Sequence, residues 1–165
     1  MVKFAVRAIL LPAAIALGAC STQAATDAAG APVAQEPAVH PESGLAVIDL
    51  SVTGASGRHP FRVEVAASPA EQQRGLMFRT AMGADEGMIF PLAQVRMASF
   101  WMRNTVIPLD IIFIGPDNRI LNIAANTTPY SETPVPSIGP AKAVLELNGG
   151  RAAELGIVAG DLVAW

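Results

Sequence analysis

Cysteine and histidine are scarce in this sequence, which has one cysteine, Cys20, and two histidines in 165 residues. A lone thiol cannot form an intramolecular disulfide, and a zinc site needs several Cys, His or acidic ligands. A histidine-based catalytic triad would depend on His59, which lies in a Gly-rich turn, because His40 lies in a polar, Pro-containing segment. These shortages argue against disulfide-stabilised, zinc-dependent and histidine-triad proteins, and we expect no cofactor and no metal.

Charge is scarce as well. Charged residues make up 15% of the chain, and the formal net charge is −3, whereas about a quarter of an average protein is charged. The sequence has no run of Lys or Arg and no basic patch with interleaved aromatic residues, which argues against nucleic-acid binding. It also has no P-loop, dinucleotide-binding fingerprint or nucleophile elbow. An enzyme of this composition would have to work with carboxylates and arginines.

The first 20 residues are typical of an export signal. Lys3 and Arg7 provide a positively charged start, and residues 8–18 provide an apolar segment that is too short to span a bilayer. The signal ends in Leu-Gly-Ala-Cys, which resembles the bacterial lipobox, and this resemblance implies that Cys20 is lipidated. Lipid would anchor the chain to a membrane surface without a spanning helix. In the alternative, cleavage near Ala24 leaves a soluble periplasmic protein.

A tether is predicted after the signal. Residues 21–44 are rich in Ala, Pro, Ser, Thr and Gln and have no apolar periodicity, so we expect them to be disordered. By resemblance to Gram-negative lipoproteins, Ser21 after the cysteine favours the periplasmic face of the outer membrane. The folded domain is then residues 45–165, and the apolar composition of the chain indicates one compact core.

The folded part is predicted to be mainly β, in the α+β class. We expect about seven or eight short, mostly antiparallel strands in a barrel or a strongly bent sheet. A helix near residues 68–77 begins with a capping box, in which Ser68 is the N-cap, Pro69 follows it and Glu71 lies three residues after the cap. A short helix is expected near residues 151–155. The predicted strands are residues 45–52, 61–65, 87–90, 100–104, 109–114, 119–125, 143–148 and 162–165.

Residues 100–114 are the most regular stretch of the chain, and they divide at Pro108. Before the proline, alternation places Trp101 and Arg103 on one face of an extended segment. After it, the residues are apolar on both faces except Asp110, which predicts a strand that is buried on both sides. A carboxylate in such a strand needs an ion-pair partner or several backbone donors.

Four segments of the folded part carry a family resemblance. They are Arg79 with the Leu-Met-Phe before it, Gly-Met-Ile-Phe at residues 87–90, the whole of residues 100–114, and Val-Leu-Glu-Leu-Asn-Gly-Gly at residues 144–150. Together they resemble the uncharacterised bacterial and archaeal family DUF192 over nearly all of residues 45–165. The resemblance implies a compact, mainly β domain with no established activity, often exported or lipid-anchored. It also implies Cys in many relatives where this chain has Tyr130, so a redox role there would be lost.

Two carboxylates, Asp110 and Glu146, are candidates for catalysis. Each lies among apolar strand residues, and different environments could separate their pKa values for acid and base work. In the alternative, each is a structural carboxylate with an ion-pair or amide partner, and Arg79 and Arg103 are the available arginines. The sequence leaves both interpretations open.

A second candidate site is an aromatic and polar platform for a sugar or another polar ligand. It would consist of Trp101, Arg103 and Asn104 beside the Pro-rich loop that holds Tyr130. In the alternative, Trp101 belongs to the core. The residues that we expect at a ligand site are Arg79, Trp101, Arg103, Asn104, Asp110 and Glu146.

Three functional hypotheses follow from these candidates. The first is a non-catalytic binding or accessory domain of the cell envelope that recognises a polar ligand, either a glycan or a protein partner, through residues 101–110. The second is a carboxylate hydrolase that uses Asp110 and Glu146. The third is a structural or assembly module, for which we expect a large apolar surface patch and no polar pocket.

Overall fold

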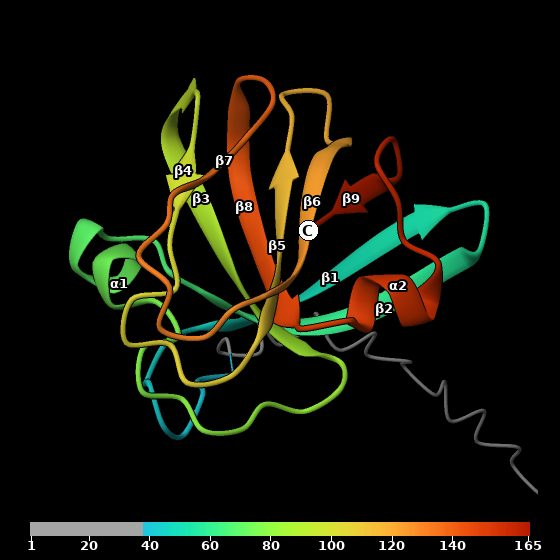
Figure 1. The fold of residues 1–165 in the computed structure, drawn as a ribbon. Helices are drawn as coiled ribbons and strands as arrows, with labels where there is room; N and C mark the ends of the chain where they lie inside the picture. Colours follow the sequence, from blue (N-terminus) through green and yellow to red (C-terminus); the bar gives the residue numbers. More distant parts are fainter. Residues whose placement is uncertain (1–37) are drawn as a thin grey trace, which may run out of the picture. The chain divides into compact units, whose positions relative to one another are not determined.

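Nine β-strands and two short helices make up residues 38–165, the part of the chain that this computed structural model describes (Figure 1). The predicted mainly-β class is therefore confirmed. The elements in chain order are β1 (Val47–Gly54), β2 (Gly57–Val65), α1 (Pro69–Arg74), β3 (Glu86–Arg96), β4 (Ser99–Phe100), β5 (Leu109–Ile114), β6 (Ile120–Thr127), β7 (Val135–Pro136), β8 (Ala141–Asn148), α2 (Arg151–Leu155) and β9 (Leu162–Ala164).

Seven strands form one sheet in the order β6-β5-β8-β3-β2-β1-β9, and β4 pairs with β7 in a separate ribbon. The pairs in the large sheet are antiparallel except β2 with β3, which are parallel and are joined by a crossover that contains α1. The barrel that we expected as one alternative is not formed, because edge strands β6 and β9 do not pair along their length. An isolated bridge between Arg119 and Leu162 joins the two edges at one point, which fits the bent sheet that was the other alternative.

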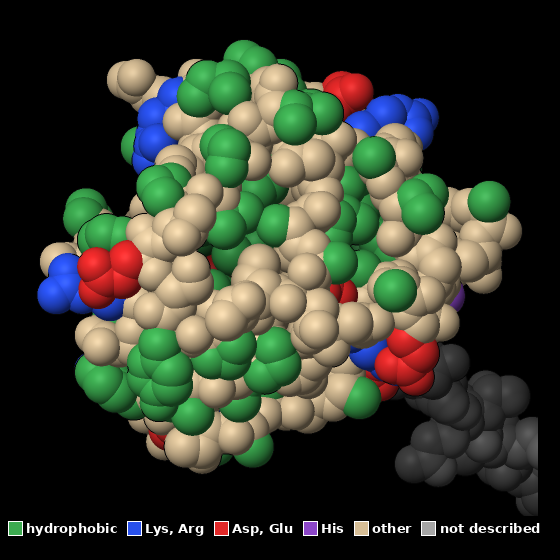
Figure 2. All heavy atoms as spheres, viewed as in Figure 1, with side chains coloured by type: hydrophobic (Ala, Val, Ile, Leu, Met, Phe, Trp, Pro, Cys, Tyr) green, Lys and Arg blue, Asp and Glu red, His purple; other side chains and the backbone are tan. Residues whose placement is uncertain are grey.

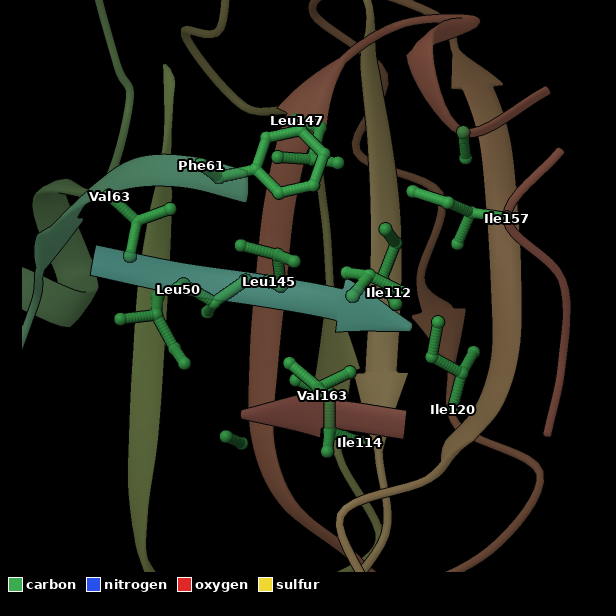
Figure 3. Packing of buried hydrophobic residues seen from close by; sticks show 14 residues of the cluster. Leu50, Phe61, Val63, Ile112, Ile114, Ile120, Leu145, Leu147, Ile157 and Val163 are labelled. Carbon is green, nitrogen blue, oxygen red and sulfur yellow. The ribbon is translucent and has the colours of Figure 1, made fainter. Parts of the chain in front are cut away.

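One face of the bent sheet encloses the first hydrophobic core. Leu145 and Leu147 of β8 point into it, as do Ile112 and Ile114 of β5. Figure 3 shows these side chains with β1 and β9 crossing over them and Val163 packed among them. The bend therefore lets strands at one end of the sheet cover the apolar face of strands in its middle, and each buried aliphatic side chain contributes about 1.5–3 kcal/mol.

The alternate side chains of the same strands form a second core on the other face of the sheet. Val144 of β8, Met88 of β3 and Ile111 of β5 lie in this core, as the two-residue period of a strand requires. Phe100 of β4 packs against it, with its ring edge-on to Phe113 of β5 and the ring centroids 6.1 Å apart. The β4–β7 ribbon thus covers part of this face.

Helix α1 forms at the predicted capping box but is shorter than predicted. The Glu71 amide donates to the Ser68 hydroxyl (3.3 Å), and the Ser68 amide donates to the Glu71 carboxylate (2.7 Å). The bond from the Ser68 amide holds the pKa of the Glu71 carboxyl below its ordinary value. The helix ends at Arg74 rather than near residue 77 because Gly75 adopts a φ of 47°, which a helix cannot continue.

Strand β3 continues through Pro91, where the sequence predicted that it would stop. Pro91 pairs with Ala143 of β8, and its carbonyl oxygen points to the other side and accepts a hydrogen bond from Gln72 Nε2 (2.7 Å). Because the nitrogen and oxygen of a strand residue point to the same edge, the missing N–H of Pro91 costs no bond to β8. Strand β7 was also unexpected, since it lies in the Pro-rich segment of residues 126–140 that predicts a loop.

The folded part begins before the predicted boundary at residue 45. Residues 38–44 make a turn in which Val39 forms a bridge with Ala46, and the Ser43 hydroxyl donates a hydrogen bond to the buried carboxylate of Glu64. The last residues of the predicted tether therefore belong to the fold.

The predicted export signal in residues 1–20, with Cys20, and residues 21–37 of the predicted tether lie outside the described residues. Among the helices that are described, none has the length and apolar character needed to cross a membrane. On the face of the domain drawn in Figure 2, Lys and Arg lie in separate groups around the edge, most of them beside Asp or Glu, and no continuous basic surface is visible.

Candidate functional site

A cavity of about 500 Å³ opens on the face of the sheet that carries the second core, and we call it the Glu146 cavity. Its size lies within the range of small-molecule sites. Apolar side chains and a similar number of polar and charged side chains line it together. The lining residues are Gln72, Gln73, Arg74, Gly75, Leu76, Met77, Phe90, Leu92, Arg96, Ser99, Phe100, Trp101, Arg103, Thr105, Pro134 and Glu146.

Glu146 lies on β8, in the middle of the sheet, and forms the floor of the cavity. Met88 of β3 is beside it on one side, and Ile111 of β5 is beside it on the other. The residue is only 5% exposed, and burial raises the pKa of its carboxyl from the ordinary value of 4.5 to about 8. A carboxyl with this pKa is neutral at pH 7, so its O–H can donate a hydrogen bond into the cavity.

Trp101 and Arg103 lie at the mouth of the cavity. The guanidinium carbon of Arg103 is 5.6 Å from the centre of the Trp101 ring, a cation–π distance. Arg103 Nε is also 3.8 Å from a carboxylate oxygen of Glu132, in an exposed ion pair. Trp101 is 47% exposed, so the alternative in which it belongs to the core is wrong.

Backbone hydrogen bonds tie together the loops beside the mouth. The Phe78 amide donates to the Asn104 carbonyl (2.9 Å), and the Tyr130 amide donates to the Thr105 carbonyl (3.1 Å). Phe78, Asn104 and Tyr130 all have positive φ angles, of 66°, 55° and 61°. This conformation is uncommon for large side chains and persists only where the surroundings impose it. The mouth is therefore built from loops of defined conformation.

Arg79 belongs to a separate buried ion cluster beside the cavity. Its Nη1 and Nη2 donate to the two carboxylate oxygens of Glu64 at 2.9 and 3.1 Å, and its Nε lies 3.1 Å from Glu42. Arg79 and Glu64 are 6% and 3% exposed, and Ser43 donates a further bond to Glu64. His40 belongs to the segment that we expected to be disordered, but its Nδ1 lies 3.7 Å from a carboxylate oxygen of Glu64. This cluster fastens residues 38–44 onto the sheet.

Asp110 is completely buried and lies on the opposite face of the sheet from Glu146. In the register of β5 and β8, Asp110 is opposite Leu147 of the first core, whereas Glu146 is opposite Ile111 of the second. Its carboxylate accepts three backbone hydrogen bonds, from Asn126 (2.7 Å), Gly150 (2.9 Å) and Ala152 (2.8 Å). This residue joins the start of β5 to the ends of β6 and β8 and to the start of α2, which is a structural role.

The sequence profile of DUF192, described as "Uncharacterized ACR", matches residues 51–165. The chain belongs to the DUF192 family. No curated protein matches it. Among solved structures, this DUF192 domain is similar to a protein of unknown function from Novosphingobium aromaticivorans, with 63% identity, a TM-score of 0.78, and coverage of 80% of this chain and 94% of that one.

A second similar structure is that of a proposed transcription regulator from Sinorhizobium meliloti. It is 39% identical to this chain, with a TM-score of 0.71, and the match covers 73% of this chain and 94% of the other. These comparisons support the family and the fold of the DUF192 domain, and they leave its activity open.

Of the six residues predicted for a ligand site in this DUF192 domain, three line the Glu146 cavity, namely Trp101, Arg103 and Glu146 itself. Asn104 lines a neighbouring hollow with Trp101 and Arg103, and Arg79 lines another hollow next to Glu42. Asp110 does not join them. The structure therefore does not bring Asp110 and Glu146 together as a catalytic pair.

The ion-pair partners suggested for these carboxylates are also wrong, because Arg79 pairs with Glu64 and Arg103 with Glu132. Sequence reasoning missed Arg74 and Arg96, which line the cavity from the end of α1 and the end of β3. Within residues 38–165, no three side chains of His, Asp or Glu gather as metal ligands.

Proposed function

We propose that this domain is a non-catalytic binding module of the cell envelope that recognises a small ligand in the Glu146 cavity. The observation that carries the proposal is the cavity itself, in which a buried carboxyl faces space that no described side chain fills. Apolar walls combined with convergent polar groups are typical of a ligand site, and this cavity has both. The ordered loops at the mouth add to this, because a preformed site loses less entropy on binding.

Binding at the mouth through Trp101 and Arg103 fits a glycan, which was the first ligand class expected from the sequence. Sugars pack their C–H faces on aromatic rings, while arginine donates to their oxygens. A hydrolase based on Asp110 and Glu146 has less support, since the two carboxyls lie on opposite faces of the sheet. A role in transcription regulation, as proposed for the S. meliloti protein, is less favoured, because a chain with a net charge of −3 and no run of Lys or Arg does not favour contact with nucleic acid.

A fluorescence titration tests the binding proposal. In a Trp165→Phe background, Trp101 is the sole tryptophan, so its emission reports on the mouth of the cavity. We expect glycan fragments of the envelope to shift this emission and Arg103→Ala to weaken the response by about tenfold. If no fragment shifts the emission and Arg103→Ala changes nothing, the glycan assignment is wrong.

A cavity-filling variant provides the matched control. Ser99 lines the cavity and is exposed on β4, so Ser99→Phe adds a ring to the cavity without replacing a core residue. Thr53→Phe makes a similar change at an exposed position of β1, away from the cavity. We expect Ser99→Phe to abolish binding and Thr53→Phe to preserve it. Equal effects of the two variants would contradict binding in the cavity.

We further propose that the domain is lipid-anchored through Cys20 at the periplasmic face of the outer membrane, with a soluble periplasmic form as the alternative. The motif at the end of the apolar segment supports this proposal. Metabolic labelling with a radioactive fatty acid is expected to label the wild-type protein and not Cys20→Ser. Equal labelling of both, or labelling of neither, would contradict the anchor.

An assembly role is the second candidate, and one observation favours it. Phe78, Trp101 and Tyr130 are 59%, 47% and 61% exposed, and they lie in loops near the cavity mouth. Exposed large apolar side chains that lie close together are typical of protein interfaces. Analytical ultracentrifugation of the wild type and of Phe78→Ser distinguishes a self-assembly role from a ligand-binding role. Self-assembly requires that the wild type associates and that Phe78→Ser associates more weakly.

A further inference from the structure

The charges that line the Glu146 cavity are all positive. Arg74, Arg96 and Arg103 contribute guanidinium groups, and the single acidic residue of the lining, Glu146, is neutral at pH 7 because it is buried. Residues 38–165 hold 9 Lys and Arg, which are the 11 of the chain less Lys3 and Arg7. One third of these basic residues therefore line one cavity of a chain with a net charge of −3.

These arginines are not neutralised by buried partners. Arg103 is 3.8 Å from Glu132, but both side chains are more than half exposed, so this pair is weak and can exchange for another anion. Arg96 is exposed and donates to the Met97 carbonyl (3.2 Å). Because a carbonyl oxygen is neutral, this bond leaves the positive charge of Arg96 uncompensated. Arg74 is exposed at the end of α1 and makes no ion pair with the other described residues. The cavity thus has a positive rim.

The interior of the cavity differs from its rim. Leu76, Phe90, Leu92 and Phe100 form apolar walls, and the Phe90 and Phe100 rings meet edge to face with centroids 5.1 Å apart. Such walls disfavour a compact, fully hydrated anion such as inorganic phosphate, because its charge would be desolvated against hydrocarbon. At the floor, the Glu146 carboxyl has no hydrogen-bond partner among the described residues, so it is available to donate to a ligand oxygen.

We propose that the Glu146 cavity binds a small organic acid. Its anionic group lies among Arg74, Arg96 and Arg103, its apolar body packs on the phenylalanine walls, and an uncharged oxygen at its inner end accepts a hydrogen bond from Glu146. This assignment rests on the proposed binding function and names the chemical class of the ligand. Two sources share this chemistry, namely a uronic acid of an envelope glycan and a free aromatic hydroxy acid, and the experiment separates them.

Isothermal titration calorimetry of the full chain with matched probes tests the proposal. The first probe, 3-(4-hydroxyphenyl)propanoate, carries the anion, the apolar body and the inner oxygen. The amide of this acid lacks the negative charge, and 3-phenylpropanoate lacks the inner oxygen. We expect the amide to bind at least about tenfold more weakly and 3-phenylpropanoate to bind several-fold more weakly. For the glycan source, glucuronate is compared with glucose, which lacks the carboxylate.

Variants locate the two recognition groups. Arg96→Met is expected to weaken binding of the acid by about tenfold and to leave binding of the amide unchanged. Arg62 is an exposed arginine of β2 outside the cavity, and Arg62→Met is expected to change neither affinity. Glu146→Leu is expected to remove the preference for the hydroxylated probe, whereas Glu146→Gln, which still donates a hydrogen bond, retains it.

The outcomes separate this inference from the proposed function. If the amide binds as tightly as the aromatic acid, or glucose as tightly as glucuronate, the cavity is a ligand site but its ligand is not an anion. This result overturns the inference and leaves the proposed function standing. If no acid binds at millimolar concentration, the inference is again overturned, and the glycan titration of Trp101 decides the proposed function separately. Tight binding of the aromatic acid, or of glucuronate, with the expected loss in Arg96→Met supports the inference and identifies the source.

Discussion

Replacing Glu146 with glutamine is expected to stabilise the domain at alkaline pH and to leave its stability nearly unchanged in acid. The glutamine amide has almost the same shape as a protonated carboxyl but never becomes charged. Between pH 4.5, the ordinary pKa, and about 8, the pKa in the folded protein, the unfolded chain loses the Glu146 proton while the folded protein keeps it. The folded state then binds more protons than the unfolded state, so the free energy of unfolding of the wild type falls as pH rises through this window.

The magnitude follows from the width of the window. Each pH unit within this window lowers the free energy of unfolding of the wild type by about 1.4 kcal/mol. Over the interval from pH 4.5 to about 8, the wild type therefore loses on the order of 5 kcal/mol relative to Glu146→Gln. Below pH 4.5 both states hold the proton, and the two proteins differ only in the hydrogen bonds of an amide and an acid. Such a loss is a large part of the stability of a typical domain.

Urea denaturation at closely spaced pH values between about 4 and about 9 measures this difference, with circular dichroism as the signal. Asp49→Asn removes a carboxylate that is 88% exposed, and we expect its stability to follow that of the wild type at every pH. A free-energy difference between the wild type and Glu146→Gln that stays constant with pH would refute the conclusion that Glu146 is protonated in the folded domain.

Three further predictions concern the groups that hold the site in place. Asp110→Asn should lower the free energy of unfolding by about 2–4 kcal/mol in urea denaturation, because an amide cannot accept all three backbone bonds, and an effect as small as that of Asp49→Asn would contradict the structural role. Arg79→Ala should lower the free energy of unfolding by about 3–5 kcal/mol, because it leaves Glu64 buried without its partner. The double replacement Arg79→Met with Glu64→Leu should recover part of this stability, and no recovery would mean that the loss comes from packing. Ser68→Ala should cost about 1 kcal/mol through loss of the N-cap, whereas an unchanged denaturation midpoint would show that α1 does not depend on it.

Local sequence patterns were sufficient to predict much of the fold. Strand β5 (Leu109–Ile114) matches its predicted bounds because it is an uninterrupted apolar run between a proline and a turn, and α2 (Arg151–Leu155) ends where glycine allows a positive φ. Alternation also placed Trp101 and Arg103 on one face, and both are exposed, although the sequence left open whether Trp101 belongs to the core. In each of these cases, the deciding interaction is local along the chain.

The environment of Asp110 and Glu146 could not be predicted in the same way. The two residues have the same sequence context, a carboxylate within an apolar strand, but the register of β5 against β8 places them on opposite faces of the sheet. Register depends on pairing between residues that are far apart in sequence, which one sequence does not reveal. Asp110 receives three backbone donors and Glu146 receives none, so one is a structural residue and the other faces a cavity.

Arg74 and Arg96 were missed for a related reason. A charged residue near the end of a helix or strand usually lies in solvent, and pattern reasoning assigns it that role. Both residues are indeed exposed, and they become part of a site only because residues from distant parts of the chain, such as Glu146 of β8, line the same cavity. Their function can be seen only in the folded arrangement.

Methyl-resolved NMR of the full chain, titrated with 3-(4-hydroxyphenyl)propanoate, tests the central claim most directly. The claim is that the Glu146 cavity is a ligand site. Leu76 and Leu92 line this cavity, while Leu50 lies in the first core on the opposite face of the sheet. The account predicts saturable shifts of the Leu76 and Leu92 methyl signals and an unchanged signal for Leu50. Saturable binding of the acid that leaves both cavity leucine signals unchanged would contradict it.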